Sequence, residues 1–415
     1  MLRLIVFVQR FLLRLSYAWY RLATPASKRE SIDWVVGVNE LASMVYQVSR
    51  ALPGSYSVSL ARGGAYNFDY DVMYRRGASA SANARRALII GPLVLGRLMN
   101  EARGFLYVGA SGFLTESADR RAFEFAFLKK HGLKIGVYWC GSEIRSTAKM
   151  HELERNTGLA NISTYIGILN PYFETELHER VQQERARVAN RYADVMFDNP
   201  IDQSSYLTGH REPFYYFMND NRFADNEAKF DDLSRPVITH GTTSPVIKGT
   251  ALVRAAIAKL REEGYDFEYV ELIGVSNEKL LSELRRSHIA LNQLYGFTTT
   301  VFGIEALAAQ CAVLSSTDET IEPHMPPHTN KAMMVTKHWQ VYDHLRQLLD
   351  EPERIKPLAL YGQAWARVYA SVSTTGPVLQ GILDAVLDGS YDREARALVS
   401  REGRYGDQPP IAEPR

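Results

Sequence analysis

Short apolar runs alternate with longer amphipathic segments over the first half of the chain. The apolar runs predict strands because turn residues bound them, whereas the amphipathic segments have the period of helices. This alternation indicates a mainly parallel sheet with crossover helices. The predicted strands are 32–38, 55–61, 105–109, 133–139 and 193–198, and the predicted helices are 39–51, 92–102, 119–131 and 173–192. The segment 62–86 has no clear period and is expected to be a loop.

A second alternating block begins at Pro236, with strands predicted at 237–240, 269–274, 288–294 and 312–316 and helices at 250–263, 277–287 and 303–310. Two such blocks predict an α/β fold of two Rossmann-like domains that face each other across a cleft. We divide the chain into an amphipathic helix (1–28), a first domain (29–207), a linker (208–235), a second domain (236–372), a closing helix (373–390) and a tail expected to be disordered (391–415).

The first 24 residues have the pattern of a helix with a narrow basic stripe on a broad apolar body. The stripe holds Arg3, Arg10, Arg14 and Arg21, and Trp19 and two tyrosines suit the interfacial zone of a bilayer. This pattern predicts a helix that lies in the plane of an anionic membrane, with the protein peripheral on the inner, cytoplasmic face. The alternatives are a helix docked on the protein's own core, a helix that binds a partner protein, and a signal peptide, which the arginines disfavour.

Composition narrows the class of protein. The chain has 415 residues, of which 46% are hydrophobic and 23% charged, so global disorder is excluded. The net charge of +1 disfavours nucleic acid as a partner, because such binding needs an excess of Lys and Arg. The charge is unevenly distributed, since residues 1–30 carry +5 and the remaining residues −4. Cys140 and Cys311 are too few for a disulfide framework and favour a reducing compartment.

The second block carries two segments with candidate chemistry. In THGTTSPVIKGT (239–250), a strand leads through a loop of small residues into a helix that begins near Lys248. Loop amides, a helix N-terminus and a lysine together suit a diphosphate. In GFTTTVFGIEALAAQCAVLSS (296–316), a Thr-rich loop leads into a helix that opens at Gly303, and Glu305 lies in its predicted first turn. Glu305 could bind a ribose diol or simply cap the helix.

Other chemistries fit the sequence less well. His324 and His328 have the spacing of a metal pair, but two prolines between them break a helix and a third ligand is not apparent. Asp318, Glu319 and Glu322 are expected to form a solvated loop. The sequence has no Walker loop, no Gly-x-Ser-x-Gly elbow and no Gly-x-Gly-x-x-Gly fingerprint, which disfavours NTPases, α/β-hydrolases and nicotinamide dehydrogenases.

The order and spacing of these segments resemble the GT-B glycosyltransferases of family 4. The resemblance rests on HGTTSPVIKGT, SHIALNQLYGF and VFGIEALAAQCAVLSS, and in the first half on YVGASGFL, FLKKHGLKIGVYWCGSEIRS and YADVMFDNP. It implies a GT-B architecture and transfer of a sugar, with retention of configuration, from a UDP- or GDP-linked donor. The acceptor would be a lipid-linked or cell-surface glycan. The resemblance implies no metal and no cofactor.

The resemblance also implies roles for individual residues. Lys248 would neutralise the departing diphosphate and Glu305 would bind the donor ribose. The remaining donor-binding candidates are His240, Thr242, Thr243, Thr299, Thr300 and Gly303. In the first domain Glu143 is a catalytic candidate, and the acceptor-binding candidates are Gly37, Asn39, Ser142 and Arg145.

Two positions depart from the family pattern. Thr243 stands where the family has an arginine five residues before the lysine, and Phe297 stands where it has the first of two glutamates. The first change removes a cation from the diphosphate site, and the second removes a charge that orients the transferred sugar. The alternative function is therefore that of a relative that binds a nucleotide-sugar or a glycan without turnover.

Overall fold

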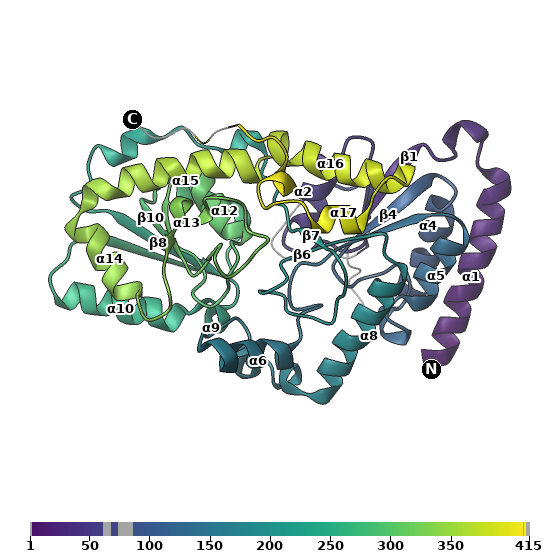
Figure 1. Ribbon diagram of the computed structural model, residues 1–415, viewed down its shortest axis with the longest axis horizontal. Coiled ribbons are helices and arrows are strands. Elements are labelled where there is room, and N and C mark those ends of the chain that lie inside the picture. The colour runs from purple at the N-terminus through teal and green to yellow at the C-terminus, as the bar shows by residue number, and fades with distance from the viewer. Residues whose placement is uncertain (1, 61–67, 74–85, 410, 412–415) are drawn as a thin grey trace.

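The computed structural model describes residues 2–60, 68–73, 86–409 and 411. It confirms the predicted α/β fold, with two parallel sheets in two domains that lie side by side (Figure 1). Most of the predicted loop 62–86 lies outside the described residues. Its described part, 68–73, includes the two-residue strand β3 (Val72–Met73).

The first sheet has the strand order β3-β2-β1-β4-β5-β6-β7 and parallel pairing throughout the described residues. Alternate side chains of β1 enter two cores, Val35 on one face and Trp34 and Val36 on the other, which explains the continuous apolar run. The other strands are β1 (Ile32–Gly37), β2 (Tyr56–Ser59), β4 (Ala102–Val108), β5 (Lys134–Tyr138), β6 (Val195–Asp198) and β7 (Glu212–Pro213). The helices are α2 (Met44–Ala51), α4 (Gly91–Leu98), α5 (Ala122–Lys130), α6 (Thr147–Thr157), α7 (Ile166–Leu169) and α8 (Glu176–Tyr192).

The second sheet has the order β12-β11-β10-β8-β9, again with parallel pairing. The order reverses between β8 and β10, and in open α/β sheets ligands bind outside the carboxyl ends of the strands at such a switch point. The strands are β8 (Val237–Thr242), β9 (Glu268–Ile273), β10 (Ile289–Leu291), β11 (Ala312–Ser315) and β12 (Met334–Val335). The helices are α9 (Pro245–Lys248), α10 (Thr250–Glu262), α11 (Asn277–Arg286), α12 (Val301–Ala308), α13 (Thr329–Ala332), α14 (Val341–Asp350) and α15 (Ile355–Ala370).

The chain crosses between the domains at two adjacent points. Phe217 belongs to the core of the first domain and Met218 to that of the second, and the chain returns at Ser371. Met218 and Ser371 form a parallel bridge, so the two crossing segments lie side by side. After the return, α16 (Val372–Asp388) packs on α2 and completes the core of the first domain (Figure 1).

Two expectations about the connecting segments were wrong. The linker predicted at 208–235 begins inside the first domain, because β7 is the last strand of the first sheet and Tyr215 is buried in its core. The tail is folded from 391 to 409, with α17 (Arg393–Ala397) and a buried Tyr405 whose hydroxyl donates to His324 O at 2.6 Å. Tyr391 also packs on the first-domain core and donates to Glu212 Oε1 at 2.9 Å, so two tyrosines anchor a tail whose polar composition had suggested disorder.

Residues Leu2–Ala23 form the predicted helix, α1, which packs along α4 at the outer end of the first domain. Leu13 is fully buried, and Ser16 Oγ donates to Leu93 O at 3.1 Å. A Cβ added to Gly96 of α4 would lie 2.5 Å from Ser16 Oγ, so the two helices approach closely because position 96 has no side chain. The interpretation of a helix docked on the protein's own core is therefore right for one face of α1.

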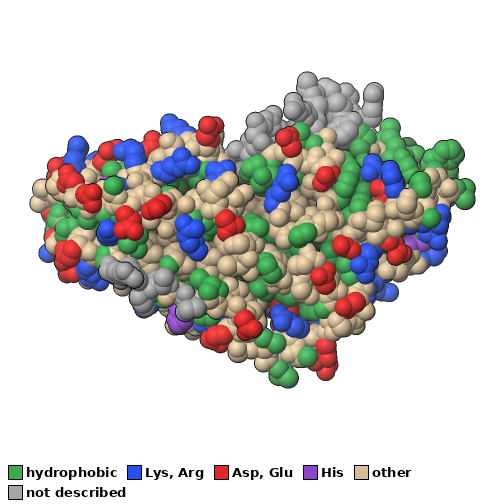
Figure 2. Space-filling model, turned by 90° about the horizontal axis from the view of Figure 1, so that it is seen from above, with side chains coloured by type: hydrophobic (Ala, Val, Ile, Leu, Met, Phe, Trp, Pro, Cys, Tyr) green, Lys and Arg blue, Asp and Glu red, His purple; other side chains and the backbone are tan. Residues whose placement is uncertain are grey.

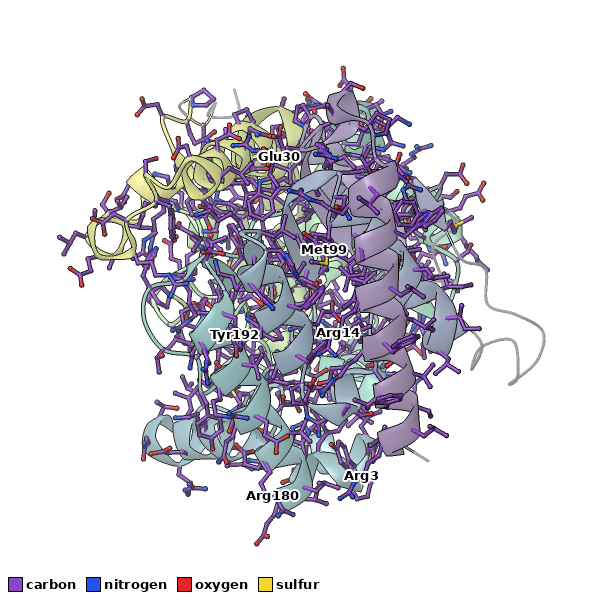
Figure 3. The ribbon with its side chains drawn as sticks, turned by 90° about the vertical axis from the view of Figure 1, so that its right-hand side faces the viewer. Arg3, Arg14, Glu30, Met99, Arg180 and Tyr192 are labelled. Atoms are coloured by element: carbon purple, nitrogen blue, oxygen red, sulfur yellow. The ribbon has the colours of Figure 1, made fainter. Side chains whose placement is uncertain are left out.

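The opposite face of α1 is apolar and exposed. Its six large side chains are 56–87% exposed and lie at helical spacing: Leu4, Phe7, Phe11, Leu15, Trp19 and Leu22. They contribute to the hydrophobic surface at the α1 end of the molecule (Figure 2). Arg3 and Arg14 lie on the same flank of the helix (Figure 3). Arg10 pairs with Asp119 at 2.7 Å. In the part of the chain that the structure describes, helices long and apolar enough to span a bilayer are absent.

Candidate functional site

A cavity of about 300 Å³ lies between the two domains. The second domain contributes the loops that follow β8, β9 and β10, so the cavity opens at the switch point of the second sheet. The first domain contributes residues that follow β1, β5, β6 and β7. The charged residues that line the cavity are Arg145, Asp202, Lys248 and Glu305.

Lys248 reaches this cavity from a sharp turn. It ends the four-residue helix α9, and Gly249, with φ +78°, connects α9 to α10. Where a single helix start was expected, the chain forms the short helix α9 and then the longer helix α10, with the lysine at their junction. Its Nζ donates a hydrogen bond to Gln293 Oε1 at 2.7 Å, and burial lowers the pKa of the ammonium to about 8. A buried ammonium with one neutral partner favours an anionic ligand.

Glu305 lines the same cavity and is 6% exposed. Because α12 begins at Val301, two residues earlier than predicted, Glu305 lies in the second turn and does not cap the helix. Asn277 Nδ2 donates to Glu305 Oε1 at 2.7 Å, which leaves Oε2 available. Burial raises the pKa of this carboxyl to about 7. Such a carboxyl can accept hydrogen bonds from a diol.

The Thr-rich loop lies between Gln293, which is the partner of Lys248, and helix α12, which carries Glu305. Thr300 caps α12 by accepting from Gly303 N at 3.2 Å and donates to Asn292 Oδ1 at 2.8 Å. A Cβ on Gly303 would lie 2.4 Å from Thr299 Oγ1, so this glycine permits close packing and does not itself line the cavity. Thr242, Thr243, Thr299 and Thr300 all line the cavity, as expected of donor-binding residues.

His240 does not fit the expected donor-binding role. Its side chain is fully buried, and Nδ1 lies 2.9 Å from Leu291 O while Nε2 lies 2.9 Å from Thr250 Oγ1. Both ring nitrogens therefore have protein partners, and His240 is not among the residues that line the cavity. It fixes β8 to β10 and to α10, a structural role that the sequence does not distinguish from ligand binding.

The first-domain candidates divide into one residue inside the cavity and four outside it. Arg145 lines the cavity. Glu143, expected to be catalytic, accepts a hydrogen bond from Cys140 N and is held in its own loop. Asn39 donates to Ser111 Oγ at 2.8 Å, Gly37 packs against Val58, and Ser142 is exposed. These four do not line the cavity between the domains.

Sequence reasoning missed two acidic residues that tie the domains together. Asp202 Oδ1 accepts from the backbone N–H of Phe297 at 2.8 Å, and Oδ2 accepts from Arg145 Nη2 at 3.0 Å. Glu322, expected in a solvated loop, is fully buried, and its carboxyl accepts from the backbone N–H of Asp202. Phe297 is 2% exposed and offers only its backbone here.

The histidine pair does not form a metal site. His324 Nδ1 lies 2.8 Å from Asp198 O in the core, and His328 directly precedes the short helix α13. Within the described ranges, three or more His, Cys, Asp or Glu side chains are nowhere grouped to hold a metal ion.

Solved structures of the same architecture are known. The HepE protein of Anabaena, solved with UDP and glucose, has a TM-score of 0.52 at 10% identity, and the match covers 86% of this chain and all of that one. Sucrose-phosphate synthase of Thermosynechococcus elongatus has a TM-score of 0.55 at 12% identity over 87% of this chain and all of that one. These likenesses show that the fold is of the GT-B type. No protein-family model and no curated protein sequence matches the chain.

Proposed function

We propose that the protein is a glycosyltransferase that moves a sugar from a nucleotide-sugar donor to an acceptor hydroxyl. The observation that carries this proposal is the joint placement of Lys248 and Glu305 in one interdomain cavity at the switch point of the second sheet. An ammonium for the diphosphate and a carboxyl for the ribose are the groups that such a donor needs.

The chemistry requires stabilisation of a leaving group. The bond between the anomeric carbon and the terminal phosphate oxygen breaks, and its electron pair stays on the phosphate. The acceptor oxygen then bonds to the anomeric carbon, and the acceptor proton leaves with the nucleoside diphosphate. Lys248 stabilises the negative charge that develops on the phosphate, so metal-independent transfer is part of the proposal. The sequence resemblance supports retention of configuration.

The membrane surface is the proposed place of action, on the inner, cytoplasmic face. The exposed apolar face of α1, with Arg3 and Arg14 on its flank, supports binding to anionic lipid. A helix docked by its other face holds the first domain at the bilayer. A lipid-linked or surface glycan is then the proposed acceptor, because such acceptors are concentrated at this interface.

Binding without turnover is the second candidate function. Phe297 supports it, because its apolar side chain is 2% exposed and does not line the cavity. Thr243 supports it too, since it lines the cavity without a charge. Hydrolysis or transfer of a nucleotide-sugar donor distinguishes the first function from the second.

The test combines nucleotide binding with turnover. Thermal stabilisation is measured with UDP, GDP and ADP and their glucose conjugates, for the wild type and for Lys248→Ala and Glu305→Ala. The matched controls are Lys279→Ala and Glu278→Ala, which are exposed positions on α11. We expect stabilisation in the wild type and the controls and its loss in both cavity variants. Stabilisation that survives both substitutions contradicts the site, and binding without hydrolysis or transfer of any donor in the panel favours the second function.

A further inference from the structure

The cavity between the domains holds two basic side chains, one from each domain. Of the described residues that line it, Arg145 and Lys248 are the two that carry a positive charge. Lys248 follows β8 in the second sheet, and Arg145 follows β5 in the first. Burial is the main cause that lowers the pKa of Lys248, and the charges of Asp202, which raises it, and of Arg145, which lowers it, act on the same ammonium.

Arg145 is held in a fixed direction by Asp202. Its Nε donates to Asp202 O at 2.6 Å and its Nη2 donates to Asp202 Oδ2 at 3.0 Å. The guanidinium is therefore tied along one edge, and its Nη1 donates no hydrogen bond within the described residues. The side chain is 7% exposed. A planar guanidinium with one edge fixed presents its remaining N–H groups to a bidentate oxyanion.

Asp202 is itself fixed by the second domain. It accepts from Phe297 N at 2.8 Å, and its own N–H donates to Glu322 Oε2 at 2.9 Å. Asp202 thus links Arg145 to the loop that follows β10 and leads into α12. This arrangement places an arginine of the first domain against the loop of the second domain that leads into α12 and Glu305.

We infer that Arg145 binds the diphosphate of the nucleotide together with Lys248, and that Asp202 is its positioning residue. The inference rests on the proposed function and assigns Arg145 to the donor, where the sequence had suggested the acceptor. A diphosphate carries at least two negative charges, and Lys248 alone compensates one of them. Thr243 contributes a hydroxyl at this site, and the guanidinium N–H groups that Asp202 does not hold supply further donors from across the cleft.

The inference predicts that Arg145 distinguishes diphosphates from monophosphates. The experiment measures the Kd of UDP and UMP, and of GDP and GMP, by calorimetry for the wild type and Arg145→Gln. We expect the substitution to weaken diphosphate binding roughly 10- to 100-fold, because a charge-assisted hydrogen bond is lost, and to change monophosphate binding far less. Arg254→Gln is the matched control, since this exposed arginine pairs with Glu271 outside the cavity.

A double variant separates a loss of diphosphate binding from a loss of folding. Arg145→Gln alone leaves Asp202 without its buried cation, whereas Arg145→Gln with Asp202→Asn removes the ion pair as a unit. The inference expects both variants to lose the preference for diphosphates. An unchanged preference in a folded double variant overturns the inference while the proposed function stands. Failure of the wild type to bind any of these nucleotides overturns both.

Discussion

Glu322 of the second domain accepts a hydrogen bond at 2.9 Å from the backbone N–H of Asp202 in the first domain. The same carboxyl also accepts from Ile201 N at 2.9 Å and from His324 N at 3.2 Å. One buried side chain therefore satisfies three backbone donors where the two domains meet. Because buried donors without partners are costly, the domain contact depends on this residue.

Replacing Glu322 should destabilise the protein. Glu322→Ala leaves two buried N–H groups and one partly buried N–H group without acceptors, and we expect a loss of about 2–4 kcal/mol in the free energy of unfolding. Urea denaturation measures it. Glu353→Ala, at an exposed position, should stay within about 0.5 kcal/mol of the wild type. Equal stability of the two variants would show that the contact contributes nothing.

Nucleotide binding should weaken at alkaline pH. Burial lowers the pKa of Lys248 to about 8 in the free protein, so the ammonium that attracts the diphosphate is lost as the pH rises through that value. We expect the Kd of the preferred nucleoside diphosphate to increase between pH 7 and pH 9, with proton uptake on binding. Lys248→Arg keeps its charge and should show a flatter profile. Calorimetry in buffers of different ionisation enthalpy measures both effects.

The stability of the protein should depend on the ionisation of Glu305. Burial raises the folded pKa to about 7, above the unfolded value near 4.5. The folded chain therefore holds the proton more tightly, and the stabilisation is complete below pH 4.5 and lost as the pH rises towards 7. Glu305→Gln, which can still accept from Asn277, should be more stable than the wild type at pH 8 by about 2 kcal/mol. A difference that does not change between pH 5 and pH 8 contradicts this account.

The outer face of α1 should bind anionic vesicles. Phe7→Glu with Phe11→Glu places charge on exposed positions, so folding should be kept while partition to phosphatidylglycerol-containing vesicles falls at least tenfold. Deleting residues 1–24 should also release the protein from membranes, but it uncovers the face of α4 that Leu13 covers. The point variants are therefore the sharper test, and Glu278→Gln serves as a surface control. Unchanged co-sedimentation of the variant would refute the membrane role.

The docking of α1 should depend on Gly96. Gly96→Ala places a methyl group 2.5 Å from Ser16 Oγ, and we expect a loss of about 1–3 kcal/mol with faster proteolysis of the first 24 residues. Gly381 of α16 is the matched control, because a Cβ there meets no atom within 4 Å. Gly381→Ala should stabilise the protein by about 0.5–1 kcal/mol. Thermal melts and limited trypsin digestion distinguish the two variants.

The fold could be predicted because each main strand corresponds to a short apolar run in the local sequence. The loops after β8 and β10 were also predictable. Lys248 and Glu305 follow these strands within short segments whose pattern is visible in the sequence. In the first domain Arg145 was predicted as a site residue, but Asp202 was not, because it becomes important only where Phe297 and Glu322 of the other domain approach it. The local sequence around Asp202 does not show that these residues of the second domain lie next to it.

Two errors share a physical cause. His240 was assigned to the donor although its ring nitrogens face Leu291 and Thr250, and Glu322 was assigned to solvent although backbone donors surround it. In both cases a polar residue satisfies backbone or hydroxyl groups inside the protein. Residue type predicts hydrogen-bonding capacity, whereas the partner is set by packing.

The two adjacent crossings at Met218 and Ser371 bear on how fast a ligand can leave the cleft between the domains. Since both segments lie side by side, we expect the cleft to open by rotation about this line, with α16 remaining on the first domain. Such a rotation must separate Asp202 from Phe297 and from Glu322. If a nucleotide binds in this cleft as proposed, we expect its residence time to depend on how often these hydrogen bonds break, so substitutions at Glu322 should increase the rate of release measured by stopped-flow kinetics.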